Sequence, residues 1–459
     1  MVIRSTRVVL ADGVRPASIH VENGVIARIE EDDSRGASLS VERADVLDAG
    51  NLIILPGVID THVHVNEPGR TEWEGFDTAT RAAAAGGVTT IVDMPLNSVP
   101  ATTTVAALEE KRSAALGRCH VNVAFWGGVV PGNASELEPL VDAGVRGFKC
   151  FLVPSGVEEF QHVGERELGE AMPILARRGV PLLVHAESPE KIFPPTRPTY
   201  EAYLASRPPV AEVEAVRMMI RLARELGTRT HIVHVACAEA VEAISRAKQD
   251  RVPITAETCP HYLTFAGEEI GEDATQFKCA PPIRDSHHRE ALWSGLCSGA
   301  LDLVVTDHSP APPALKCGGD FSRAWGGIAS LELSLAAVWT RDRLRKPPFA
   351  DDSQVVAPTF VPWRSGDPIE RVARWMCSGP AALAGLSRKG RIAPGCDADL
   401  VVFDPDAEWT VDPSRLQQRH KLTPYAGRVL RGAVRTTFVR GVRVWDDGRL
   451  VHDGAGRLE

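Results

Sequence analysis

The middle of the chain alternates between short apolar runs and longer stretches rich in alanine and glutamate. Eight of the runs have the length and near-continuous apolar character of strands that are covered on both faces, as in a parallel sheet. They span residues 59–65, 89–94, 121–126, 145–152, 181–187, 230–236, 253–258 and 301–308. Eight such strands with intervening helices predict an α/β fold, namely a (β/α)8 TIM barrel over residues 57–390.

The two ends of the chain differ from the middle, because both have the pattern of short strands separated by turns. Near the N-terminus, Asn23-Gly24 stands between two alternating segments, which is a hairpin signal. Near the C-terminus, residues 437–445 show the same strand-and-turn character. The simplest arrangement joins residues 1–56 and 391–459 in one small composite β-sandwich beside the barrel.

Two local patterns refine this outline. The sequence Thr71-Glu72-Trp73-Glu74 has the form of a capping box, in which the Thr71 hydroxyl and the Glu74 carboxylate satisfy the first free amides of a helix. The helix that follows would end at Gly86-Gly87. Residues 341–368 contain several prolines, which predicts an irregular insertion.

The composition narrows the class of protein. Asp and Glu number 60 against 51 Lys and Arg, so the formal net charge is −9, and a binder of nucleic acid or of anionic membranes would need a basic face instead. Nine cysteines without a CxxC pair, and no secretory leader, favour reduced thiols over a disulfide framework. No stretch approaches the ~18 apolar residues of a membrane span. We therefore expect a soluble, cytoplasmic protein.

Histidine and aspartate interrupt the apolar runs at their ends. His62 and His64 lie two positions apart on the first predicted strand, so both rings face the same side and can hold one metal ion. His185, His234 and Asp307 end three later strands, and in a barrel such ends converge at the mouth that carries catalytic groups. Imidazole and carboxylate ligands suit Zn²⁺ or a neighbouring divalent metal. The alternative is a set of surface histidines or histidines satisfied within the core.

Lys149 lies inside the apolar strand of residues 147–152, where an unpaired ammonium would be costly. One interpretation is a lysine that extends to the surface or pairs with a buried acid. The other is chemical: near two divalent cations the amine would lose its proton and react with CO2 to give a carbamate. A carbamate has two oxygens, so it can bridge two metal ions.

This ordered set of residues resembles the binuclear cyclic amidohydrolases, which include dihydroorotase, hydantoinase or dihydropyrimidinase, and allantoinase. The resemblance covers essentially the whole chain, including the split sandwich. The segments that look specifically like the allantoinase branch are VHVNEPGRTEWEG (63–75), FKCFL (148–152), KCAPPIRD (278–285), DHSP (307–310) and WGGIASL (325–331). The residues after His234, Val235-Ala236-Cys237, depart from the small hydroxyl residues that the family commonly has there.

The resemblance implies a centre of two divalent ions per chain, with zinc expected first and cobalt or manganese as alternatives. Its ligands would be His62, His64, Lys149, His185, His234 and Asp307. Lys149 would be an N6-carboxylysine that bridges both ions. Asp307 would also be the catalytic residue that shuttles a proton to the leaving ring nitrogen, and pure ligation is the alternative role.

The resemblance also implies where the substrate binds. The family relies on main-chain groups, which by position would be those of Ala280 and Gly326. Asn97 is a further candidate, although a turn-stabilising role would explain it equally. Dihydroorotases usually carry an arginine two positions after the second histidine, where it pairs with the substrate carboxylate. Asn66 stands there in this chain, which suits a neutral hydantoin ring.

The resemblance therefore implies hydrolysis of the hydantoin ring of allantoin to allantoate, in purine degradation. A hydantoinase or dihydropyrimidinase of broader specificity is the enzymatic alternative. A non-catalytic scaffold with the same fold is another, but such a scaffold would be expected to have lost some ligands. The expected partners are the small-molecule substrate and other copies of the chain, because the family is usually homotetrameric.

Overall fold

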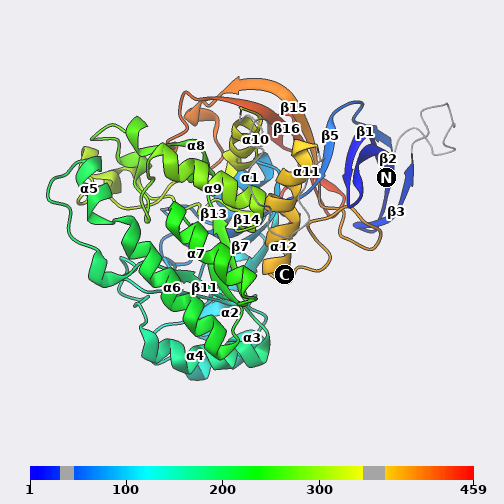
Figure 1. The fold of residues 1–459 in the computed structure, drawn as a ribbon. Coiled ribbons are helices and arrows are strands. Elements are labelled where there is room, and N and C mark those ends of the chain that lie inside the picture. Colours follow the sequence, from blue (N-terminus) through cyan, green and yellow to red (C-terminus); the bar gives the residue numbers. More distant parts are fainter. Residues whose placement is uncertain (32–45, 345–366) are drawn as a thin grey trace.

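The computed structural model describes residues 1–31, 46–344 and 367–459 (Figure 1). The predicted insertion at residues 341–368 lies outside the described residues except at its two ends. No helix in the described ranges is long and apolar enough to cross a membrane.

All eight predicted apolar runs contain a strand. The strands are β6 (Val58–Val63), β7 (Val88–Asp93), β8 (Asn122–Phe125), β10 (Phe148–Phe151), β11 (Leu182–His185), β12 (Thr230–Ile232), β13 (Ile254–Thr258) and β14 (Leu303–Val304). Several are shorter than their apolar runs: β12 ends before Val233 and β14 ends before Val305. The prediction of an α/β fold with parallel strands is therefore confirmed.

The parallel strands pair in two groups. One group is β6-β7-β8, and the other runs from β9 (Gly127–Gly128) through β10, β11, β12 and β13 to β14. Trp126 alone separates β8 from β9, so the chain passes directly from one group to the other. At the opposite end, His308 follows β14 and forms a parallel bridge with Val63 of β6.

Helices follow the strands along the chain. They are α1 (Phe76–Ala85), α2 (Val105–Ala115), α3 (Leu137–Asp142), α4 (Glu165–Arg178), α5 (Tyr200–Ser206), α6 (Pro209–Leu226), α7 (Ala238–Gln249), α8 (Pro260–Thr264), α9 (Ser286–Ser298), α10 (Ser334–Leu344), α11 (Pro368–Ala373) and α12 (Gly379–Leu383). In α6 the buried residues Val216, Met219 and Ala223 recur at helical spacing, which gives one apolar face. Figure 1 shows α6 and α7 outside the parallel strands.

The start of α1 differs from the sequence prediction. Gly75 is the N-cap and no side chain of the predicted capping box bonds the helix. Glu67 instead accepts a hydrogen bond from the Phe76 amide at 2.9 Å. Glu74 is buried and accepts from the Arg419 amide at 3.0 Å, so it is not available to cap the helix. The predicted end is confirmed, because the helix stops at Ala85 before Gly86.

Strands from both chain ends form one nine-stranded sheet. They are β1 (Val2–Leu10), β2 (Gly13–Glu22), β3 (Val25–Glu31), β4 (Val46–Asp48), β5 (Ile53–Pro56), β15 (Leu400–Thr410), β16 (Val429–Val439), β17 (Val442–Asp446) and β18 (Arg449–Leu450). The predicted hairpin is present, since β2 and β3 are antiparallel and both Asn23 and Gly24 have positive φ. Strand β5 lies between β1 and β15, where the blue and orange parts of Figure 1 meet.

Candidate metal centre

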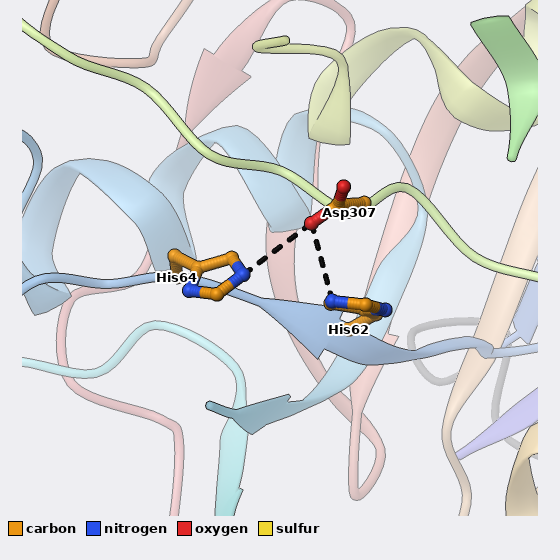
Figure 2. Close-up of side chains that lie close together, drawn as sticks. All are labelled: His62, His64 and Asp307. Atoms are coloured by element: carbon orange, nitrogen blue, oxygen red, sulfur yellow. Dashed lines mark ion pairs between the residues drawn. The ribbon is translucent and has the colours of Figure 1, made fainter. Parts of the chain in front are cut away.

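Three of the predicted ligands come together at the ends of β6 and β14. The Nε2 atom of His62 lies 3.1 Å from Oδ1 of Asp307, and Nε2 of His64 lies 3.3 Å from the same oxygen (Figure 2). One ligand atom from each of these residues lies within 4.8 Å of the others. Two imidazole nitrogens and a carboxylate oxygen at this spacing form a donor set for a divalent transition metal.

The carboxylate of Asp60 accepts hydrogen bonds from the backbone next to these residues. One oxygen of Asp60 accepts from the His62 amide at 3.0 Å, and the other accepts from the Thr306 amide at 3.1 Å. The carboxylate therefore ties β6 to the segment after β14. Asp307 itself has a φ of 48°, a left-handed conformation that turns its side chain away from the direction that strand alternation would give.

A buried carboxylate orients His62. Oε1 of Glu257 lies 2.5 Å from Nδ1 of His62, which leaves Nε2 facing Asp307. The other oxygen of Glu257 lies 2.9 Å from Nε2 of His231. Burial by itself raises the pKa of Glu257, but the two histidines outweigh it and lower that pKa to about 2. Metal-binding histidines commonly have such a carboxylate partner.

His185 and His234 lie beside this cluster. Their ring centroids are 4.6 Å apart, and the His234 ring is 5.5 Å from that of His62. Oε2 of Glu187 lies 2.7 Å from Nε2 of His185, so a buried carboxylate orients this ring as well. Arg207 in turn donates from Nε to Glu187 at 3.0 Å. His234 has a φ of 41°, and its Nδ1 has no partner in the described part of the chain.

Lys149 is the remaining predicted ligand. Its side chain is 0 % exposed, and Nζ has neither a hydrogen bond nor an ion pair within the described residues. Nζ lies 4.9 Å from the centroid of the Phe151 ring, which stacks on His185 at 4.7 Å. Burial lowers the pKa of Lys149 to about 8. The interpretation of a lysine paired with a buried acid is wrong, since no acid lies within ion-pair distance in the described ranges.

Of the predicted substrate residues, Asn97 lies beside a proposed ligand. Nδ2 of Asn97 is 3.4 Å from Nδ1 of His64. A Cβ placed on Gly326 would lie 4.0 Å from the Cα of Cys279, the neighbour of Ala280, so the two predicted main-chain segments are adjacent. The unusual segment after His234 is held by a glutamate, because Ala236 and Cys237 donate their amides to Glu212 at 2.9 and 3.2 Å.

Sequence reasoning missed the residues that orient the histidines. They are Glu257, His231, Glu187 and Arg207. One signal was present for two of them: Glu187 and Glu257 are charged residues inside or at the end of apolar strand segments, as Lys149 is. Their histidine partners are not given by sequence spacing, since Glu257 and His62 are 195 positions apart.

Comparisons with known proteins give consistent results. Residues 53–444 match the amidohydrolase family. An allantoinase from Streptomyces avermitilis is 46% identical over 100% of this chain and 98% of its own length. An allantoinase from Arabidopsis thaliana is 40% identical over 100% of this chain and 90% of its own length. Among solved structures, an L-hydantoinase (dihydropyrimidinase) from Arthrobacter aurescens has a TM-score of 0.89 and 32% identity, covering 100% of this chain and 98% of that one.

Proposed function

The chain belongs to the amidohydrolase family, and from this membership we propose that it hydrolyses the hydantoin ring of allantoin to allantoate, in purine degradation. It is a hydrolase of cyclic amides that acts on a small molecule. The observation that carries the proposal is the full-length similarity to allantoinases of a bacterium and a plant. The cluster of His62, His64 and Asp307 supports it, since it supplies donors for a divalent metal.

We propose that the centre holds two divalent ions, zinc first and cobalt or manganese as alternatives. His62, His64 and Asp307 would hold one ion, and His185 and His234 the other. Lys149, as an N6-carboxylysine, would bridge both. The unpartnered Nζ of Lys149 supports this assignment, because a carbamate there would replace a costly orphaned amine with an anion facing two cations. The lowered pKa, about 8, also favours the neutral amine that reacts with CO2.

When bound, the ions would supply Lewis acidity that brings the pKa of water near neutrality and polarises the ring carbonyl. Asp307 takes the proton of the attacking water and delivers it to the ring nitrogen as the C–N bond breaks. The position of Asp307 favours this role, since its Oδ1 lies within 3.3 Å of Nε2 of both His62 and His64, the proposed ligands. Glu257 holds His62 in the tautomer and orientation that keep its Nε2 on the same side.

A neutral substrate fits the groups near the centre. Asn66 is 1% exposed, and its Oδ1 has no partner among the described residues. An amide in this position offers hydrogen bonds but no countercharge, so it matches an uncharged ring better than a carboxylate. We assign ring recognition to the main-chain groups of Ala280 and Gly326, with Asn97 as a further contact through its place beside His64.

We further propose that the parallel strands close into a (β/α)8 barrel over residues 57–390. The step from β8 to β9 and the bridge from His308 to Val63 support closure. Residues 1–56 and 391–459 would form the composite sandwich, and their shared sheet supports that division. We also propose a cytoplasmic homotetramer. The nine cysteines, all described, form no disulfide, which suits a reducing compartment.

Substrate preference tests the proposed function directly. The purified, metal-loaded protein is expected to hydrolyse allantoin with a higher kcat/KM than hydantoin or dihydrouracil. The release of allantoate and of the two ring-opened products would be measured under identical conditions. Faster turnover of hydantoin or dihydrouracil would contradict the proposal and assign the chain to the broader hydantoinase activity. Absence of any turnover after loading with Zn²⁺, Co²⁺ or Mn²⁺ would favour the scaffold.

Replacing Glu257 with glutamine is expected to weaken metal binding by about 10- to 100-fold, because the charged partner of His62 is lost. The affinity would be measured by competition with a chromogenic chelator. Glu74→Gln is the matched control, since Glu74 is equally buried and its oxygens face the Arg419 amide at 3.0 Å and His308 at 3.6 Å, neither of which is a proposed ligand. Equal affinities in Glu257→Gln and Glu74→Gln would show that Glu257 does not support the centre.

A further inference from the structure

Two buried lysines hold the segment that contains Gly326. Nζ of Lys316 donates to the carbonyl oxygens of Trp325 and Gly327 at 3.0 and 2.7 Å. Nζ of Lys278 donates to the carbonyl oxygen of Ala324 at 2.6 Å. Lys316 is 8% exposed and Lys278 is 9% exposed, and no carboxylate pairs with either in the described part of the chain. Backbone dipoles are therefore their main partners, a costly arrangement for two cations.

Gly326 differs from its neighbours in this segment because its main-chain groups are not hydrogen-bonded within the described chain. Its neighbours Ala324, Trp325 and Gly327 all have bonded carbonyl groups. Within the described chain, neither the N–H nor the C=O of Gly326 has a hydrogen-bond partner. Gly326 is half-buried, so its unpaired N–H and C=O are open to a ligand as well as to water.

The hydrogen bonds made by the Trp325 carbonyl and the Gly327 N–H involve the two peptide units that contain the N–H and the C=O of Gly326. The carbonyl of Trp325, which accepts from Lys316, belongs to the peptide unit that carries the Gly326 N–H. The N–H of Gly327 donates to the carbonyl of Lys278 at 2.8 Å, and it belongs to the unit that carries the Gly326 C=O. A hydrogen bond at one end of a peptide unit polarises the other end. Gly326 therefore presents a strengthened donor and a strengthened acceptor.

The segment is anchored against the metal centre. Ile328 forms a parallel bridge with His308, the residue after Asp307. The Ser309 amide donates to the carbonyl of Ile328 at 3.0 Å. A Cβ on Gly327 would lie 2.1 Å from the carbonyl oxygen of Ser309, so only glycine permits this close approach. The position of Gly326 relative to Asp307 is therefore fixed on one side by this contact and on the other by Lys316.

We propose that Lys316 is a positioning residue that orients and polarises the peptide groups of Gly326, so that they bind the adjacent N–H and C=O of a neutral cyclic ureide. This inference rests on the proposed function, since it assigns recognition to the same site. Lys316 does not touch the substrate but acts through the Trp325 carbonyl. The side chain of Lys278 bonds a peptide unit that does not include Gly326, whereas its main-chain carbonyl, which accepts from Gly327, is kept in any substitution of the side chain.

This difference provides the test. Lys316→Met is expected to raise KM for allantoin about tenfold with kcat within about threefold, because binding common to the ground state and the transition state is lost. Lys278→Met is the matched control: it has similar burial and a similar bond, and its KM is expected to stay within about threefold of wild type. A purely structural role would instead affect both variants alike. Metal content and thermal unfolding would be measured for every variant.

A second readout does not depend on turnover. Binding of 2-imidazolidinone, a cyclic urea with adjacent N–H and C=O groups but no scissile amide, would be followed by calorimetry with the metal-loaded protein. Its Kd is expected to rise about tenfold in Lys316→Met and to change little in Lys278→Met. If Lys316→Met does not fold, Lys316→Gln, which removes the charge, is expected to raise the Kd in the same direction.

Three outcomes would overturn the inference. They are an unchanged KM and Kd in the Lys316 variant, equal effects in the two lysine variants, and a fall in kcat that only follows a loss of metal. Failure of the proposed function looks different, since wild-type protein would then not hydrolyse allantoin at all. In that case the calorimetric comparison would still decide the role of Lys316.

Discussion

Lys149→Ala is expected to reduce binding to at most one metal ion per chain and to lower kcat by more than about 10³-fold, because the proposed carbamate bridge and the acidity that two cations would give to water are lost together. Metal content would be measured by elemental analysis and kcat with allantoin. Short carboxylates such as acetate or propionate are expected to restore part of the activity. The space left by the truncated side chain would let them occupy the place of the carbamate.

Cys150→Ala is the matched control for this experiment. Cys150 is the next residue of β10 and is equally buried, but alternation places it on the opposite face. Its substitution is expected to cost stability without changing the metal content. Two ions per chain and full activity in Lys149→Ala would refute the carbamate bridge. Extra mass of one CO2 on the wild-type chain under native conditions would support it independently.

Asp307→Asn is expected to lower kcat by about 10²- to 10⁴-fold, the usual contribution of a general acid or base. Asparagine retains an oxygen that can face an ion, but it cannot carry the proton between water and the leaving nitrogen. Metal content measured alongside separates loss of the ion from loss of proton transfer. The KM for allantoin is expected to change much less than kcat.

Asp302→Asn supplies the comparison for Asp307. Asp302 lies just before β14, and it pairs with Lys248 at 2.6 Å, away from the proposed ligands. Its substitution is expected to affect thermal unfolding but not kcat. A kcat within tenfold of wild type in Asp307→Asn, with both ions retained, would assign Asp307 to pure ligation.

The parallel strands were predictable because each has an apolar run of the right length. The proposed ligands stand out in the sequence for a related reason: His185 and Asp307 are polar residues where an apolar pattern stops. Alternation alone was sufficient for His62 and His64, which both meet Asp307. It was not sufficient for His234 and Asp307, whose positive φ values place them outside regular strand geometry.

The supporting residues were less accessible to sequence reasoning. Glu257 contacts His62 only after β6 and β13 have taken their places in the fold, and no local pattern encodes that pairing. The start of α1 shows the same limit. The capping box predicted at Thr71–Glu74 does not form, because Glu74 instead accepts a hydrogen bond from the Arg419 amide, 345 positions away. Hydrogen bonds between residues far apart in the sequence determine both the orientation of His62 and the start of α1. Apolar periodicity is a local property, so it cannot predict such bonds.

The shared sheet constrains the order in which the chain can fold. Strand β5 pairs on one side with β1, which is made early, and on the other with β15, which begins at Leu400. During synthesis the edge of β5 therefore stays open while all the intervening parallel strands emerge from the ribosome. An unpaired edge is a template for pairing with another chain. Strand β15 thus shields the nascent protein against association through the open edge of β5.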